Sequence, residues 1–356
     1  MPHPFARDDV VASIVEATRD HEFTTFVLGY KRLPGLKYPE EEPETHRELK
    51  TTVGLELLRV WPHRSVDFYR PEMRLEVGVG PQGPEVELRP SPLFLGGRYR
   101  KLSRDIPASR WMHLSCDGRG CDGCSYTGNL CGPSIQELFS GPILRQTGGE
   151  RTFFHGLGRE DTDARMLGEG RPFVMEVSRP RRRTIDAERL LRETTDVARG
   201  YAELLEPRIV ERSTVRQVKE ADAEKTYRAW VQLSGSPPED TRERLESLAG
   251  EVIEQYSPTR VMHRRGRSKL RRRRVVSARW IGEVEDRIVW QVRAESGTYI
   301  KELISGDEGR TRPSVTERLG VPATCIALDV MAVHWTAPWE STGPMPAAGN
   351  LASERR

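Results

Sequence analysis

The stretch of the chain with the greatest capacity for acid–base chemistry is 156–173, which reads GLGREDTDARMLGEGRPF. Three carboxylates, Glu160, Asp161 and Asp163, follow Arg159 within five positions. A charged surface turn would explain the acids alone, because exposed ion pairs are common and contribute little stability. Glycines before the acids, however, permit unusual backbone angles, and the apolar residues after them must enter a core. A carboxylate held between solvent and core is suited to serve as a nucleophile, a base or a metal ligand.

Two further stretches carry groups that could assist a carboxylate. EKTYRAWV (224–231) reads as a strand whose alternation places Lys225 and Tyr227 on one face. A half-buried tyrosine is usually structural, but it can also offer its ring to a base and its hydroxyl to a proton. ESGTYIKELISGDEGRTRPSV (295–315) contains Lys301, and by itself it indicates only an ordinary strand, turn and helix.

Basic residues are concentrated in two runs. Residues 260–274 hold nine lysines or arginines in fifteen positions, and RPRRR occupies 179–183. Such density of like charge favours a polyanionic partner, and the absence of aromatic residues in the longer run favours phosphates over stacked bases. The arginines expected to contact RNA are Arg181, Arg182, Arg183, Arg264, Arg265, Arg271, Arg272, Arg273 and Arg274.

A third kind of chemistry is indicated by HLSCDGRGCDGC, the cysteine-rich knuckle. His113 and Cys116 form one close pair, and Cys121 and Cys124 form another. Four soft ligands in two pairs suit a tetrahedral structural zinc, with Cys131 as a substitute ligand. The same spacing is compatible with reduced thiols that bind no metal. Both interpretations stay open on the sequence.

The composition constrains the class of protein. The 356 residues suggest two to three domains, and the net charge is only +3 although 31% of residues are charged. The clustered, odd number of cysteines does not resemble a disulfide framework. Neither a signal-peptide core nor an apolar run of about 20 residues is present, so we expect a soluble, cytoplasmic protein that does not enter a membrane.

Patterning predicts the elements that must position these groups. Residues 133–149 read as a helix whose start carries Ser134 and Glu137, a capping box. Residues 239–256 read as a second helix, and 324–336 as a strand. Helical and strand-like stretches alternate through the chain, which favours an α+β architecture.

The order of GREDTDAR, KTYRAWV and GTYIKEL resembles the pseudouridine synthase superfamily. Over residues from about 90 to 336 the chain is most similar to the archaeal and eukaryotic family that modifies tRNA T-loop uridines 54 and 55. The resemblance implies an α+β fold: a catalytic domain with a mixed, antiparallel-rich sheet, preceded by a smaller α/β THUMP-like accessory domain. The expected parts are the accessory RNA-binding domain 1–110, the knuckle 111–132, the catalytic domain 133–337 and a disordered tail 338–356.

The resemblance also implies residue roles. Asp161 of the G-R-x-D motif would be the catalytic aspartate, and Tyr227 would stack on the target uracil and take part in proton transfer. Lys301 would pair with Asp161, and Leu303 would line the pocket. Arg159 would fill the gap that the flipped base leaves.

Tyr299, in the same stretch as Lys301, completes the expected substrate-binding set. The expected partner is the T-arm of tRNA, with no obligate protein partner. Catalysis would need no cofactor, so any zinc would be structural. Family members usually carry an early Cys-x-x-Cys, which this sequence lacks.

Two other function classes compete with this reading. Glu160, Asp161 and Asp163 could bind Mg²⁺ in a metal-dependent RNA nuclease. Alternatively, the protein could bind RNA without catalysis. The ordered set of Asp161, Tyr227 and Lys301 favours the synthase over both.

Overall fold

The computed structural model divides the chain into two compact units. It describes residues 7–30, 43–80, 83–261 and 268–340. The smaller unit comprises Met1–Leu95, Ser140–Phe153 and Met175–Asp186. The larger unit comprises Gly96–Phe139, Phe154–Val174 and Ala187–Arg356. This division departs from the expected boundaries at residues 110 and 132, because strands and a helix in the middle of the chain contribute residues to both units.

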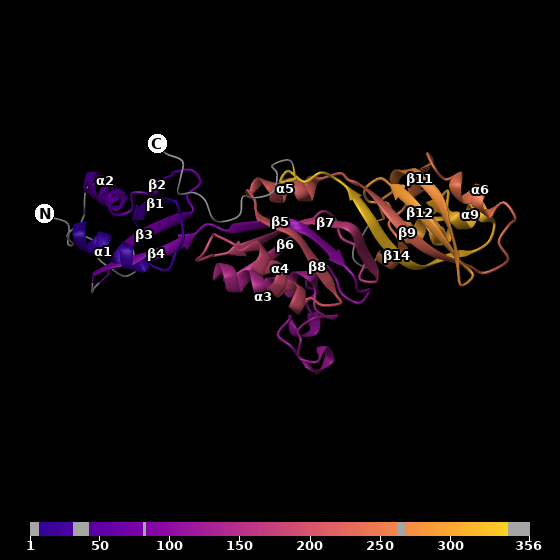
Figure 1. Ribbon diagram of the computed structural model, residues 1–356, viewed down its shortest axis with the longest axis horizontal. Helices are drawn as coiled ribbons and strands as arrows, with labels where there is room; N and C mark the ends of the chain where they lie inside the picture. The colour runs from indigo at the N-terminus through magenta and orange to yellow at the C-terminus, as the bar shows by residue number, and fades with distance from the viewer. Residues whose placement is uncertain (1–6, 31–42, 81–82, 262–267, 341–356) are drawn as a thin grey trace. The chain divides into compact units, whose positions relative to one another are not determined.

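The N-terminal part of the smaller unit is a four-stranded sheet with two helices (Figure 1). The sheet order is β2-β1-β3-β4, with β1 parallel to both of its neighbours and β4 antiparallel to β3. Its strands are β1 (Thr25–Tyr30), β2 (Ser65–Val66), β3 (Met73–Gly80) and β4 (Gly83–Pro90). Its helices are α1 (Arg7–Ala17) and α2 (Pro43–Val60).

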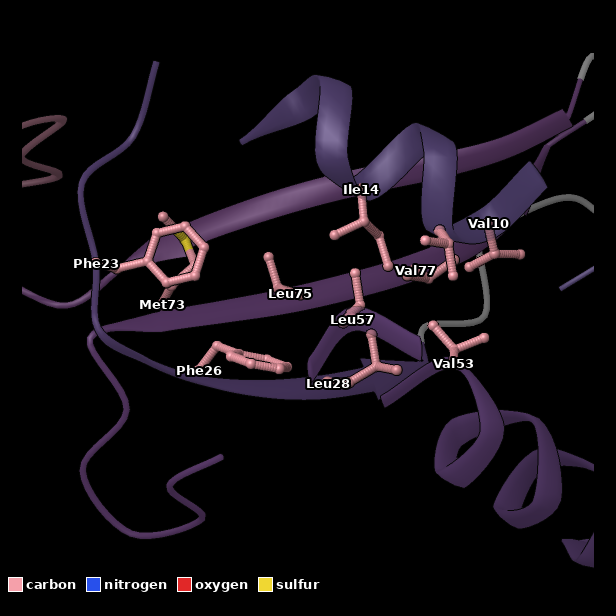
Figure 2. Packing of buried hydrophobic residues seen from close by; sticks show 11 residues of the cluster. Val10, Ile14, Phe23, Phe26, Leu28, Val53, Leu57, Met73, Leu75 and Val77 are labelled. Atoms are coloured by element: carbon pink, nitrogen blue, oxygen red, sulfur yellow. The ribbon is translucent and has the colours of Figure 1, made fainter. Parts of the chain in front are cut away.

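The core of this unit lies between the helices and one sheet face (Figure 2). Ile14 of α1 and Leu57 of α2 are fully buried, as are Phe26 and Leu75 of the sheet. Val53 lies one helical turn before Leu57, so both side chains share the apolar stripe of α2. Burying such side chains contributes about 1.5–3 kcal/mol each, which accounts for an independent core.

The larger unit is built on a mixed ten-stranded sheet (Figure 1). The order is β13-β10-β11-β12-β9-β14-β7-β5-β8, with β6 paired to β7. Strand β9 is antiparallel to β12 and β14, whereas β14 is parallel to β7. The expected α+β class with an antiparallel-rich mixed sheet is therefore confirmed.

The strands are β5 (Leu93–Lys101), β6 (Arg151–Gly156), β7 (Ala164–Ser178), β8 (Ala202–Ile209), β9 (Glu224–Leu233), β10 (Val252–Gln255), β11 (Arg271–Val284), β12 (Arg287–Ala294), β13 (Thr311–Arg312) and β14 (Ala323–His334). The helices are α3 (Ile135–Thr147), α4 (Ala187–Val197), α5 (Ser213–Glu220), α6 (Thr241–Glu246), α8 (Ile300–Ser305) and α9 (Val315–Leu319). Helix α3 starts with the expected capping box, in which Ser134 Oγ accepts from the Glu137 N–H at 3.2 Å.

The helix expected over 239–256 is wrong in its second half. Helix α6 ends at Glu246, and Gly250 takes a left-handed backbone with φ of 85°. Residues Val252–Gln255 then form β10, antiparallel to β11 at Arg271–Arg274. Pairing with a distant strand overrides the local helical pattern.

The far end of the described chain is packed. Trp339 is buried, and Glu340 forms an ion pair with Arg98 of β5 at 2.7 Å. The first residues of the segment expected to be a disordered tail therefore belong to the larger unit, and 341–356 lie outside the described residues. Across the part of the chain that the structure describes, no helix combines the length and apolarity of a membrane span.

Candidate active site

The three acids of the opening motif lie on the connection between β6 and β7. Gly158 takes φ of 72°, and a Cβ there would lie 3.3 Å from the Arg171 guanidinium, so a side chain is disfavoured on both counts. A turn in which the Ala164 N–H donates to the Asp161 carbonyl at 3.0 Å then leads into β7. The acids thus occupy a short loop before a buried strand, as expected.

Asp161 sits between two cations. Its carboxylate lies 3.1 Å from Arg260 Nη2 and 3.4 Å from Lys301 Nζ, and its side chain is 39% exposed. Asp163 is 65% exposed and lies 2.7 Å from Lys301 Nζ. Burial acts to raise the pKa of Asp163, but the hydrogen bond and charge of Lys301 outweigh it and lower that pKa below its usual value. Lys301 is therefore shared, and Arg260 is the nearer cation to Asp161.

Arg260 bridges Asp161 to a second carboxylate. It lies on the short turn Thr259–Val261, and its Nε contacts Glu302 Oε1 at 2.6 Å. Glu302 belongs to α8 and is buried. Although burial opposes its charge, the hydrogen bond and charge of Glu302 raise the pKa of Arg260 further above its usual value. A permanent positive charge therefore faces Asp161.

A pocket of about 330 Å³ opens beside this ion-pair group. Asp161 and Arg159 contribute from the loop, Tyr227 from β9, and Lys301 from α8. Its lining residues are Gly158, Arg159, Glu160, Asp161, Ala164, Arg171, Lys225, Tyr227, Arg260, Arg271, Ser296, Gly297, Thr298, Tyr299, Ile300, Lys301, Leu328 and Val330. The pocket joins a carboxylate, cations and aromatic rings in one space.

Tyr227 lies in the wall of the pocket with its side chain almost fully buried. Burial raises the pKa of Tyr227 to about 12, so the phenol stays protonated at neutral pH. Its hydroxyl can then donate a hydrogen bond or a proton, while its ring offers an apolar surface to a base. Both capacities suit the role expected for this residue.

Not every expected site residue meets the pocket. Arg159, Tyr299 and Arg271 line it, whereas Leu303 is fully buried and lies outside the lining. Arg264 and Arg265 lie outside the described residues.

The arginines of β11 alternate along the strand. Arg271 faces the pocket, with its guanidinium 5.5 Å from the centre of the Tyr299 ring, and Arg273 donates to the Ser296 carbonyl at 2.6 Å. Arg272 is exposed and forms an ion pair with Glu254 at 2.9 Å. Arg274 is also exposed and donates to the Gly250 carbonyl at 3.0 Å. The strand thus divides the basic run between two sides.

Some arginines of the second basic run, residues 179–183, form contacts within the protein. Arg183 contacts Glu72 at 3.2 Å and donates to the Ser91 carbonyl at 2.9 Å. Arg182 donates to the Arg145 carbonyl at 2.8 Å, whereas Arg181 is exposed. The Arg183 guanidinium therefore links two other segments of the smaller unit.

The geometry argues against the nuclease alternative. Glu160 turns away from Asp161 into the protein, where it contacts Arg171 at 2.8 Å and accepts from the Tyr99 hydroxyl at 2.9 Å. Among the described residues, the three carboxylates do not come together as one metal-binding group. Two-metal catalysis requires carboxylates that converge on the ions.

Three residues at or directly behind the pocket were not predicted from the sequence. Arg260 is the first residue of the longer basic run, and its contact with Asp161 becomes visible only in the folded structure. Glu302 is buried and follows Lys301 directly. This adjacency to an expected site residue is the sequence feature that could have indicated Glu302. Arg171 carries no local signal, because its partner Glu160 is reached only through strand pairing.

The knuckle brings its four expected ligands together. The ligand atoms of His113, Cys116, Cys121 and Cys124 all lie within 4.8 Å of one another. Cys124 Sγ lies 4.0 and 3.9 Å from the other two sulfurs, and His113 Nδ1 lies 3.5 and 3.4 Å from Cys116 and Cys121 Sγ. A tetrahedral ion with bonds of about 2.3 Å places sulfurs about 3.8 Å apart, so the donor set fits zinc. Main-chain N–H groups also donate to two of the sulfurs at 3.3 Å: that of Gly120 to Cys116, and those of Cys121 and Gly128 to Cys124.

Comparison with known proteins adds an independent observation. The family model described as "Pus10, C-terminal" matches residues 94–334. A protein of Methanothermobacter marburgensis named tRNA pseudouridine synthase Pus10 is 43% identical over 301 residues, covering 84% of this chain and 72% of its own. Proteins of the same name from Halorubrum lacusprofundi (38% identical, 92% and 80% covered) and Archaeoglobus fulgidus (37% identical, 92% and 91% covered) also match.

Among solved structures, a Cbf5–Nop10–Gar1 complex matches with a TM-score of 0.36 and 20% identity over 57% of this chain and 46% of that one. The sequence matches alone extend over most of the chain at 37–43% identity. They confirm the resemblance that the motifs indicated, and the chain belongs to the Pus10 family of pseudouridine synthases.

Proposed function

We propose that the protein isomerises uridine to pseudouridine in the T-loop of tRNA, at position 55 and also at position 54, with Asp161 as the catalytic carboxylate. The observation that carries the proposal is the position of Asp161 at a pocket lined by Tyr227 and by two cations. The names of the relatives supply the substrate class.

The reaction rearranges bonds within one nucleotide. The bond from ribose C1′ to uracil N1 breaks, the base turns, and C1′ bonds to C5; the C5 proton leaves and N1 gains one. An ionised carboxylate beside the sugar can act as nucleophile or base in this sequence. Arg260 and Lys301 place two positive charges beside the Asp161 carboxylate, at 3.1 and 3.4 Å.

The target uridine must leave its stack to reach Asp161, which costs a few kcal/mol. The buried ring of Tyr227 would receive the flipped base, and Tyr299 lies in the same pocket. Arg159 is exposed at the rim, where it would occupy the space the base vacates. Arg271 would hold a neighbouring phosphate.

The protein also carries a site that we assign to structural zinc. His113, Cys116, Cys121 and Cys124 supply the donors, and the N–H groups directed at the sulfurs stabilise thiolate charge. Bound zinc would fix this loop-rich segment. Uridine isomerisation itself calls for no cofactor.

The assay for this function uses tRNA labelled with tritium at uracil C5, in the presence of EDTA. The synthase releases tritium and leaves the RNA intact, whereas a nuclease cuts it and fails in EDTA, and a pure RNA-binding protein does neither. Asp161→Asn should reduce release to below about one hundredth of wild type, because an essential group contributes several kcal/mol to the transition state. Asp163→Asn is the matched control and should keep measurable activity. Mapping pseudouridine in the product distinguishes positions 54 and 55.

A further inference from the structure

Three residues that follow one another on the acidic loop are held by side chains from a single neighbouring strand and β7. Lys101 of β5 is fully buried, and its ammonium donates to the carbonyl oxygens of Asp161 at 3.1 Å, Thr162 at 2.7 Å and Ile106 at 2.8 Å. Each of its three N–H bonds therefore has an acceptor. Two of these acceptors belong to the main chain of the catalytic loop.

Tyr99 lies two residues earlier on the same face of β5. It is also fully buried, and its hydroxyl donates to the Glu160 carboxylate at 2.9 Å. Burial raises the pKa of Tyr99 well above its usual value, so the hydroxyl keeps its proton. Glu160 immediately precedes Asp161. Strand β5 therefore contacts three successive residues, through the Glu160 side chain and the Asp161 and Thr162 carbonyl groups.

Arg171 of β7 completes the attachment from a second direction. Its guanidinium contacts Glu160 at 2.8 Å and donates to the Leu157 carbonyl at 2.6 Å. Leu157 begins the loop, so both its start and its centre are fixed. Between Leu157 and Ala164, the exposed Arg159 and the Asp161 carboxylate remain directed at the pocket.

Burying the Lys101 ammonium carries a desolvation cost in free energy. A buried ammonium loses its hydration, and in this case it gains carbonyl partners rather than a carboxylate bond. A methionine would fill similar space without that desolvation cost. The benefit of the lysine is directional: three hydrogen bonds fix the course of the main chain where Asp161 must meet a sugar carbon.

We propose that Lys101 and Tyr99 are positioning residues, which hold the main chain at 160–162 so that the Asp161 carboxylate meets the ribose of the target nucleotide. This inference rests on the function proposed above for Asp161. It predicts that loss of the attachment affects the chemical step far more than it affects RNA binding, because neither side chain lines the pocket.

The test compares three variants in single-turnover tritium release with saturating protein. Lys101→Met should lower the rate by about 100-fold, as expected when a reacting group shifts by about 1 Å. Its Kd for tRNA should stay within about three-fold of wild type, because ground-state binding is untouched. Tyr99→Phe, which keeps the ring and removes one donor, should give a smaller loss of about five-fold.

The matched control is Arg98→Met. Arg98 is a buried cation on the opposite face of the same strand, and it donates to the Gly170 and Trp335 carbonyls without touching the loop. This variant should lose thermal stability yet keep the wild-type rate below its melting temperature. If Arg98→Met slows turnover as much as Lys101→Met, the effect is general destabilisation and the inference fails.

Two outcomes separate this inference from the proposed function. If Asp161→Asn is inactive while Lys101→Met and Tyr99→Phe turn over like wild type, only the positioning role is overturned. If Asp161→Asn itself keeps its activity, the assignment of the site fails. Should Lys101→Met not fold, Tyr99→Phe decides: an unchanged rate refutes the attachment, and a lowered rate with unchanged Kd supports it.

Discussion

Arg260 reaches the Asp161 carboxylate at 3.1 Å, closer than the expected partner Lys301 at 3.4 Å. The same guanidinium contacts the buried Glu302 at 2.6 Å. Arg260 is therefore held by one carboxylate while it supports another. In this arrangement Lys301 divides its charge between Asp161 and Asp163.

Replacing Arg260 should separate its catalytic and structural contributions. Arg260→Met should slow tritium release by at least about ten-fold, and it leaves Glu302 buried without its cation, which costs about 3 kcal/mol. The double variant Arg260→Met/Glu302→Gln should recover much of the lost thermal stability but not the rate. Recovery of rate and stability together would show that Arg260 acts only as the partner of Glu302.

Tyr227→Phe should bind tRNA normally and turn over slowly. The ring remains to receive the base, while the hydroxyl, kept protonated by a pKa of about 12, is lost. Measuring tRNA affinity and single-turnover rate on the same variant tests both halves of the expectation. A wild-type rate would leave stacking as the sole role of Tyr227.

The basic strand β11 offers a matched pair. Arg271→Gln should reduce the log–log salt slope of tRNA binding by about 0.7–0.9, the effect of one phosphate contact. Arg272→Gln should leave the slope near wild type, because Arg272 faces the other way and already pairs with Glu254. Equal slopes for the two variants would place the RNA elsewhere.

The order of the motifs indicated that Asp161, Tyr227 and Lys301 lie together, and the three residues line one pocket, while their roles stay predictions. The contacts that could not be predicted from the sequence depend on which strands lie side by side in the sheet. Lys101 reaches the loop only because β5 lies beside β7 in the sheet. The helix expected over 239–256 failed for the same reason, because Val252–Gln255 pair with a strand whose register no local pattern specifies.

Turnover should decline above about pH 8 through loss of the Lys101 proton. Burial lowers the pKa of Lys101 from 10.5 to about 8, and deprotonation leaves two donors for three carbonyls. The charged or titratable groups around it are Glu160, Asp161, Asp163, Arg171 and Cys131. Because the unfolded chain binds this proton more tightly between the two pKa values, the group's contribution to the free energy of unfolding rises with pH there.

Above about pH 8, turnover should therefore fall without a parallel fall in the melting temperature. Rate and melting temperature measured from pH 7 to 9.5 test this directly, and a melting temperature that falls in step with the rate would attribute the decline to unfolding. Burial also lowers the pKa of Lys225 in the pocket to about 8, so Lys225→Met is needed beside Lys101→Met. The alkaline decline should flatten in the Lys101 variant, and flattening only in the Lys225 variant would assign it to the pocket lysine.

Protein purified without chelator should contain about one zinc per chain, held by the four knuckle ligands, whose separations fit a tetrahedral ion. Chelation should lower the melting temperature, because metal bound only to the folded state contributes to folding. Turnover at low temperature should survive, since Asp161 lies on a different loop. Cys121→Ser should lose the metal, whereas Cys131→Ser, outside the ligand group, should keep it. A zinc content well below one per chain in the unaltered protein would show that the four side chains come together without a metal.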